Sequence, residues 1–141
     1  MDSINIKWNE KMSFTNEVDG HKFIIDAKED VGGENNGPRP KPLILSALGG
    51  CTAMDVISIL KKMRVEPDTF NVKVDGELSE EHPKHYYQIK ITYELTGENL
   101  SVANIKKAVE LSEERYCGVS YTLKQAMKLI SEIKINGEVV E

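Results

Sequence analysis

The feature that most restricts the fold of this chain is a long apolar segment near its middle. Of the 21 residues from Leu43 to Met63, 13 are apolar, and they fall nearly all round a helix rather than along one stripe. We therefore expect a central, buried helix that begins at Pro42, because proline suits the first helical turn. Asp55 and the pair Lys61-Lys62 interrupt the apolar run, so we do not expect it to span a membrane.

Length and composition indicate one soluble domain, residues 1–141. The chain has 141 residues, 40% hydrophobic and 29% charged, which is ordinary for a globular protein. Its 23 acidic residues exceed its 18 basic ones, and this excess argues against nucleic acid or an anionic membrane as a partner. The polar start MDSINIKWNE does not resemble a signal peptide, so we expect a cytoplasmic protein with reduced thiols.

The N-terminal third of the sequence predicts three strands and a loop. Ile4 to Trp8 and Met12 to Val18 alternate apolar and polar residues, and HKFIIDA follows. Asp19-Gly20 lies between the second and third runs and predicts a hairpin with a type I′ turn. Lys28 to Lys41 is rich in glycine and proline, which predicts a long loop leading into the central helix.

The remainder of the chain predicts a hairpin, two helices and a strand. Thr69 to Leu78 and Tyr86 to Gly97 alternate at period two, which indicates an antiparallel pair. Ser101 is placed to cap a helix, and a short helix is expected after Cys117-Gly118. Lys128 to Gly137 predicts the last strand. The order of elements indicates an α+β fold.

Both cysteines lie beside glycines, and this placement leaves several interpretations open. Gly49 and Gly50 either allow a close approach to the helix or break it, so that Cys51 begins a new helical segment with a stabilised thiolate. Asp55 shares a helix face with Cys51, and its charge is expected to raise the thiol pKa. Cys117 falls at a second predicted helix break. In the plainest interpretation each cysteine is a small buried hydrophobe.

The spacing of the possible ligands argues against a metal site. The two cysteines are separated by 66 positions, and the chain has only three histidines. We therefore expect neither a metal nor a cofactor.

Two motifs resemble the OsmC/Ohr family, and its OsmC-like branch in particular. They are RPKPLILSALGGCTAMDVISILKKMR and, about 65 residues later, LSEERYCGVSYTL. The resemblance extends over essentially the whole chain. It implies an intertwined homodimer in which two long central helices are buried between sheets from both subunits. Gly49 and Gly50 would then form a small surface for close packing beside the thiol.

The resemblance implies a thiol peroxidase that reduces organic hydroperoxides. Cys51 would be the peroxidatic thiol and Cys117 the resolving thiol, and an external dithiol would restore both. This chemistry requires two neighbouring thiols, one of them ionised, and an apolar pocket for the alkyl part of the peroxide.

The chain departs from the family pattern around the expected thiolate. Peroxidase members have an arginine in the N-terminal strands and a glutamate just before the helix, but residues 1–37 contain no arginine, and Lys41 and Pro42 occupy the expected positions of the glutamate. Arg39 is the candidate partner of Cys51, with Lys41 or Lys11 as substitutes. These departures keep open a non-catalytic protein that binds a small apolar or thiol-bearing ligand, and a protein in which both cysteines only pack.

Overall fold

The computed structural model describes all residues from 1 to 141, which form two compact units. The first unit is Met1–Ile44 and the second is Leu45–Glu141. Strands and helices occur in the order of an α+β fold, as predicted. The expectation that residues 1–141 make a single domain stays a prediction.

The first unit contains a three-stranded antiparallel sheet in the order β1-β2-β3. Its strands are β1 (Asn5–Trp8), β2 (Phe14–Val18) and β3 (His21–Ile25). Asp19 and Gly20 join β2 to β3 with φ values of 50° and 78°. Positive φ at both central residues is the type I′ geometry that matches the twist of a hairpin, so this prediction is confirmed.

Asp26 organises the loop that follows β3. Its buried carboxylate accepts hydrogen bonds from the backbone N–H groups of Ala27 at 2.8 Å, Glu34 at 3.2 Å and Asn36 at 3.1 Å. Burial opposes ionisation of this carboxyl, but the three backbone donors outweigh it and lower its pKa. One turn of 3-10 helix, η1 (Glu29–Val31), lies within this loop.

The second unit contains a four-stranded sheet in the order β4-β5-β6-β7. β4 (Thr69–Leu78) pairs antiparallel with β5 (Tyr86–Thr96), β5 pairs parallel with β6 (Lys128–Ile135), and β6 pairs antiparallel with β7 (Glu138–Val140). The sequence analysis did not predict β7. Its signal was the dipeptide Asn136-Gly137, whose φ values of 51° and 85° form the same kind of turn as Asp19-Gly20.

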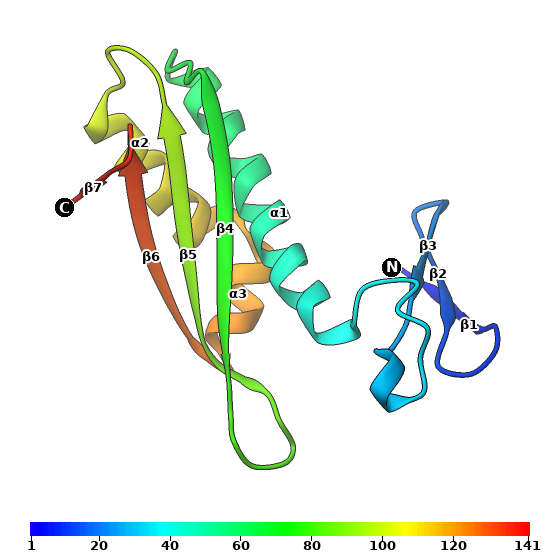
Figure 1. Cartoon of the computed structure of the whole chain (residues 1–141). Coiled ribbons are helices and arrows are strands. Elements are labelled where there is room, and N and C mark those ends of the chain that lie inside the picture. Colours follow the sequence, from blue (N-terminus) through cyan, green and yellow to red (C-terminus); the bar gives the residue numbers. More distant parts are fainter. The chain divides into compact units, whose positions relative to one another are not determined.

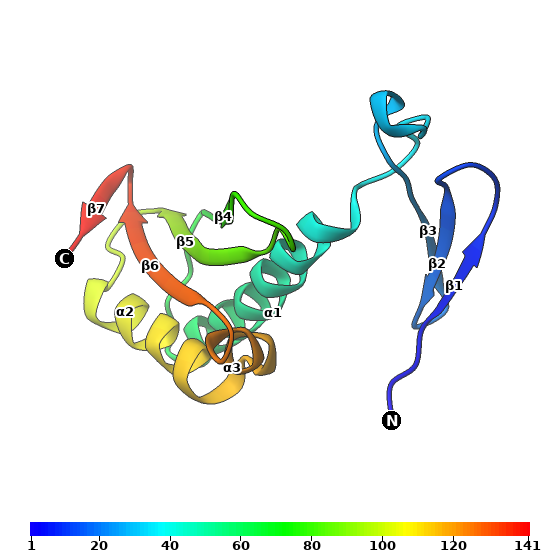
Figure 2. The same cartoon turned by 90° about the horizontal axis from the view of Figure 1, so that it is seen from below.

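Helices cover one face of this second sheet (Figures 1 and 2). They are α1 (Pro40–Lys62), α2 (Val102–Leu111) and α3 (Gly118–Lys124), and a π-helical turn, η2 (Ser112–Tyr116), joins the last two. α1 begins two residues before the predicted start. The Ser101 hydroxyl accepts a hydrogen bond from the Asn104 N–H, which confirms the predicted cap of α2.

The core of the second unit lies between β5 and the helices. Ile89, Ile91, Tyr93 and Leu95 alternate along β5 and are almost completely buried. They belong to one apolar cluster with side chains of α1 and α2. Burial of this strand explains its apolar alternation, because only one face of the sheet is covered by helices.

One side of α1 is buried and the other is exposed within the chain. The buried residues follow helical spacing: Leu48, Gly49, Thr52, Val56 and Leu60. The opposite side exposes a second, largely apolar row: Ala47, Gly50, Met54 and Ile57. Within the single chain, only one side of α1 therefore shows the burial that was predicted for all sides of the helix. By length and composition alone α1 is apolar enough to cross a membrane, as are many core helices.

Gly76 lies where β4 closely approaches Tyr86 and Leu45, and we predict that Gly76→Ala lowers stability. An added Cβ would lie 2.6 Å from ring carbons of Tyr86 and 3.0 Å from Leu45 Cδ2. Because the Tyr86 ring is buried, overpacking should cost about 1–3 kcal/mol of the free energy of unfolding. Urea denaturation at a fixed protein concentration measures this cost. Gly118→Ala is the matched control, since its Cβ would meet nothing within 4 Å.

Candidate active site

Folding brings the two cysteines together in the second unit. Cys51 lies in α1, and Cys117 lies between η2 and α3. Their sulfur atoms and a carboxylate oxygen of Asp55 all lie within 4.8 Å of one another. Asp55 follows Cys51 by one helical turn, so the predicted common face is confirmed. Both cysteines are free thiols; Cys51 is partly exposed, whereas Cys117 is 3% exposed.

The π-helical turn positions Cys117. The Cys117 N–H donates to the Ser112 carbonyl oxygen at 2.8 Å, which closes the wide turn of η2. Cys117 then leaves the helix in an extended conformation, and its sulfur accepts a hydrogen bond from the Ser120 N–H at 3.4 Å. Single π turns within helices occur frequently at functional sites. The break that the sequence predicted at Cys117-Gly118 is therefore present.

Three influences oppose ionisation of Cys51. Burial raises the pKa of this thiol, and the neighbouring Cys117 and the Asp55 carboxylate raise it further. The backbone N–H of Val119 donates to the Cys51 sulfur and acts in the opposite direction. The net pKa lies above that of an ordinary thiol, so within this unit Cys51 is mainly protonated at neutral pH.

α1 is continuous through the two glycines, which excludes the interpretation in which they break the helix before Cys51. Cys51 consequently sits in the body of the helix, where it gains no free N–H groups from a new helix start. The alternative interpretation holds for Gly49, because an added Cβ would lie 3.0 Å from Val74 Cγ2 on β4. Gly50 faces the exposed side, where an added Cβ would meet nothing within 4 Å.

A chain of buried polar groups links α1 to β5 and η2 behind the cysteines. The Thr52 hydroxyl lies 2.7 Å from the Tyr93 hydroxyl and 2.9 Å from the Ser112 hydroxyl. Ser112 donates to Asp55 at 3.3 Å, and Tyr93 donates to Glu113 at 2.9 Å. The sequence analysis missed this series of hydrogen-bonded side chains. Its members are single polar residues within apolar patterns, and nothing in the sequence indicates that they meet.

The buried polar groups have fewer hydroxyl hydrogens than hydrogen-bond contacts. Three hydroxyl groups, those of Thr52, Tyr93 and Ser112, each supply one hydrogen, but they take part in four contacts that end at two carboxyl groups. While both carboxylates are ionised, Thr52 therefore donates to only one of its two neighbours. Burial and the Glu113 carboxylate raise the pKa of Tyr93 well above its usual range, so Tyr93 remains a hydrogen-bond donor.

The third predicted site residue, Arg39, belongs to the first unit. Its guanidinium donates to Asn35 Oδ1 at 2.5 Å and to the backbone oxygens of Gly37 at 3.1 Å and Asp26 at 3.5 Å. Lys11 forms an ion pair with Glu34 at 2.8 Å, which raises the Lys11 pKa. The Arg39 guanidinium thus donates only to neutral oxygens and forms no ion pair, although its charge helps to lower the pKa of Asp26.

Comparison with known proteins identifies the family. Residues 33–132 match the family of OsmC-like proteins. Protein YhfA of Escherichia coli strain K12 is 34% identical over 131 residues, which span 92% of this chain and 95% of YhfA. The chain belongs to the OsmC-like family.

Solved structures of other organisms have the same OsmC-like fold. A hypothetical protein of Aquifex aeolicus VF5 is 28% identical, with a TM-score of 0.85 over 98% of both chains. An organic hydroperoxide resistance protein from Elizabethkingia anophelis is 11% identical, with a TM-score of 0.73 over 96% of both chains. The second likeness shows the fold alone. The fold class predicted from the sequence is therefore confirmed.

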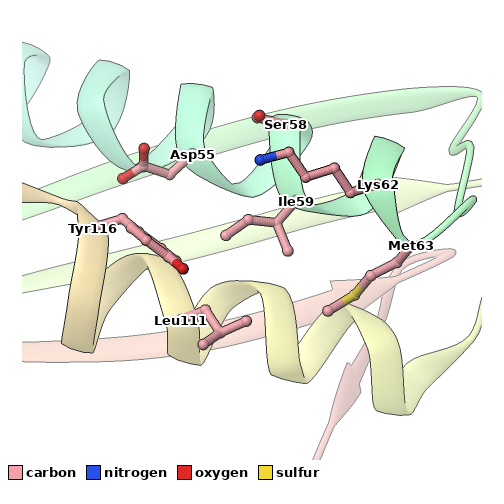
Figure 3. Close-up of a pocket in the computed structure, with 7 residues that line it drawn as sticks. All are labelled: Asp55, Ser58, Ile59, Lys62, Met63, Leu111 and Tyr116. Carbon is pink, nitrogen blue, oxygen red and sulfur yellow. The ribbon is translucent and has the colours of Figure 1, made fainter.

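A pocket of about 330 Å³ opens beside this OsmC-like cysteine pair, between α1 on one side and α2 with η2 on the other. Asp55 and Tyr116 lie at one end, and Lys62 and Met63 lie at the other (Figure 3). Between them lie Ser58 and the apolar side chains of Ile59 and Leu111. Asp55 is the group that the pocket and the cysteine cluster share. The chemistry expected from the family resemblance requires an apolar pocket, but the sequence analysis did not identify the residues that line it.

We predict that Asp55→Asn makes Cys51 more reactive without lowering stability. The substitution removes a negative charge that raises the Cys51 pKa, so the thiolate fraction at pH 7 should increase. Alkylation of Cys51 by iodoacetamide should become roughly three- to tenfold faster. The difference should vanish at high pH, where the thiol is ionised in both proteins. An unchanged rate profile would contradict the assigned effect of Asp55.

The melting temperature provides the structural control for this variant. The asparagine amide can donate a hydrogen to Ser112, so it supplies the hydrogen that the buried polar chain lacks. The variant should therefore melt no lower than the unaltered protein.

Proposed function

We propose that this protein is a thiol-dependent peroxidase that reduces organic hydroperoxides, with Cys51 as the peroxidatic and Cys117 as the resolving cysteine. The observation that carries the proposal is the proximity of the two sulfur atoms, within 4.8 Å despite 66 positions of sequence separation. Membership of the OsmC-like family supports it. The relative named for organic hydroperoxide resistance supports the choice of substrate class.

The reaction needs two thiols and one external reductant. The Cys51 thiolate attacks the O–O bond of the hydroperoxide, the alkoxide leaves and takes a proton to become an alcohol, and Cys51 becomes a sulfenic acid. The Cys117 sulfur then attacks the sulfenic sulfur, water leaves, and a disulfide forms. An external dithiol reduces the disulfide by exchange and returns both thiols.

The exposure of the two cysteines supports the proposed order. Cys51 is partly exposed, whereas Cys117 is 3% exposed. A peroxide therefore meets Cys51 first. A disulfide requires the two sulfurs, which lie within 4.8 Å of one another, to approach to about 2.05 Å.

Arg39 is the proposed cation that activates Cys51. Within the second unit the influences on Cys51 sum to a raised pKa, so fast reaction requires a positive charge from elsewhere. Arg39 precedes α1 by one residue and forms no ion pair in its own unit, where its guanidinium donates to neutral oxygens. It would take the place of the arginine that peroxidase members of the family carry in the N-terminal strands.

A homodimer in the cytoplasm is the proposed working form. The exposed side of α1 carries Ala47, Gly50, Met54 and Ile57, and Met54 is 74% exposed. The first sheet likewise exposes Ile6 and other large apolar side chains. Such surface is costly in water, and a second copy of the chain would cover it as in the intertwined dimers of this family.

The alternative function is a non-catalytic binding protein. The raised pKa of Cys51 and the pocket beside it favour this alternative, because the pocket combines apolar side chains with Lys62 at its far end. Such a protein would hold a small apolar ligand without oxidation of Cys51. The response to peroxide separates the two functions.

We predict that one equivalent of cumene hydroperoxide converts the reduced protein to a Cys51–Cys117 disulfide. Mass spectrometry should show a loss of two hydrogens per chain and no thiol open to alkylation. Cys117→Ser should instead stop at the sulfenic acid of Cys51, which a dimedone-type probe would trap. If the mass does not change and both thiols can still be alkylated, the proposed peroxidase function is wrong and the binding function is retained.

We predict that Arg39→Gln slows the reaction of Cys51. Loss of the positive charge should raise the thiol pKa and reduce alkylation at pH 7 by roughly three- to tenfold, with a pH profile displaced to higher pH. Arg64→Gln is the matched control, since Arg64 is exposed beyond the end of α1. Equal profiles for both variants would remove Arg39 from the site while leaving the roles of the cysteines intact.

A further inference from the structure

We propose that Cys51, Asp55 and Cys117 form a binding site for a zinc-class divalent cation when both thiols are reduced. The three side chains offer two sulfur donors and one carboxylate oxygen, all within 4.8 Å of one another. In a tetrahedral zinc site, with bonds of about 2.0–2.3 Å, neighbouring ligand atoms lie about 3.5–3.8 Å apart. Small side-chain rotations therefore bring the donors to coordinating distance.

Charge favours a cation at this point. Two thiolates and a carboxylate would place three negative charges in one partly buried cluster, and within the second unit Asp55 forms no ion pair. A divalent cation would offset this charge, because coordination stabilises ionised thiols that would otherwise repel one another.

Each donor already has a supporting hydrogen bond. The Val119 N–H donates to the Cys51 sulfur, and the Ser120 N–H donates to the Cys117 sulfur at 3.4 Å. Ser112 donates to the Asp55 carboxylate at 3.3 Å, which leaves its other oxygen free for the metal. Such outer bonds orient ligands and stabilise their charged forms in known metal sites.

The site has an entry path and an open position. Three protein ligands leave a fourth tetrahedral position for water or a ligand. Asp55 also lines the pocket of about 330 Å³ between α1 and η2, so the proposed entry path leads through this pocket to the Asp55 carboxylate (Figure 3). Mixed sulfur and oxygen donors suit zinc rather than magnesium or calcium, which prefer oxygen alone.

The sequence spacing of the two cysteines did not indicate this site. Two of its ligands are one helical turn apart, and the third arrives through the tertiary contact between α1 and η2. The inference shares the cysteines of the proposed peroxidase but does not rest on peroxide turnover. Disulfide formation would remove both sulfur donors, so oxidation and metal binding exclude each other.

The test is a zinc titration of the fully reduced protein against a chromogenic chelator, without peroxide. We expect one zinc per chain with micromolar or tighter affinity, rising with pH as the thiols ionise. Cobalt(II) should give the thiolate charge-transfer absorption and intense visible bands of a tetrahedral site. Magnesium should not compete.

Single substitutions test which side chains bind the zinc ion. Cys117→Ser and Asp55→Asn should each weaken zinc binding by at least tenfold, although Asp55→Asn is expected to speed alkylation of Cys51. Asp75→Asn is the matched control, because Asp75 is exposed on β4 and pairs with Lys73. Its affinity should equal that of the unaltered protein.

Three outcomes would overturn the inference: no binding in excess zinc, full affinity in Cys117→Ser, or full affinity in Asp55→Asn. A protein that binds zinc but forms no disulfide with peroxide would retain the metal site and lose the proposed peroxidase. A protein that forms the disulfide but binds no zinc would lose the metal site alone.

Discussion

The site depends on the buried contact between Thr52 of α1 and Ser112 of η2, whose hydroxyl oxygens lie 2.9 Å apart. Thr52 follows Cys51 directly, and the Ser112 carbonyl receives the N–H of Cys117 at 2.8 Å. One contact therefore sets the separation of two sulfurs that are distant in sequence. Both hydroxyls are fully buried, and each has a second partner: Thr52 also contacts Tyr93, and Ser112 also donates to Asp55. Loss of either hydroxyl would therefore remove a buried hydrogen bond and cost about 0.5–1.5 kcal/mol.

The same arrangement creates an electrostatic conflict. A peroxidatic cysteine works as a thiolate, yet burial, Cys117 and Asp55 all disfavour its charge within the second unit. Positive charge resolves the conflict in either of two ways. Arg39 would stabilise the Cys51 thiolate and leave Cys117 free to resolve, whereas a divalent cation would hold both sulfurs and prevent oxidation. Asp55 opposes the first arrangement and would take part in the second, so we expect its substitution to separate them.

Sequence reasoning succeeded where the signal was local. The Asp19-Gly20 turn and the period-two alternation of β4 and β5 depend on neighbouring residues, and both were predicted correctly. The pairing of the cysteines followed only from a family resemblance, because no local pattern predicts a contact between α1 and η2. The polar chain through Thr52 and Tyr93 was missed for the same reason. The sequence left open whether Gly49-Gly50 would break α1, and the helix is continuous there because packing against β4 outweighs weak helix propensity.

The apolar residues of α1 lie on both sides of the helix, but the single chain buries only one of these sides. Burial against the second sheet accounts for the row that contains Leu48, Val56 and Leu60, but not for the row that contains Met54 and Ile57. A helix that remained half exposed would gain solubility from polar residues in that second row. Their absence on the side next to Cys51 indicates that the thiol lies close to a surface shaped for burial. Whatever covers that surface also limits access of water to Cys51 and determines which charges reach it.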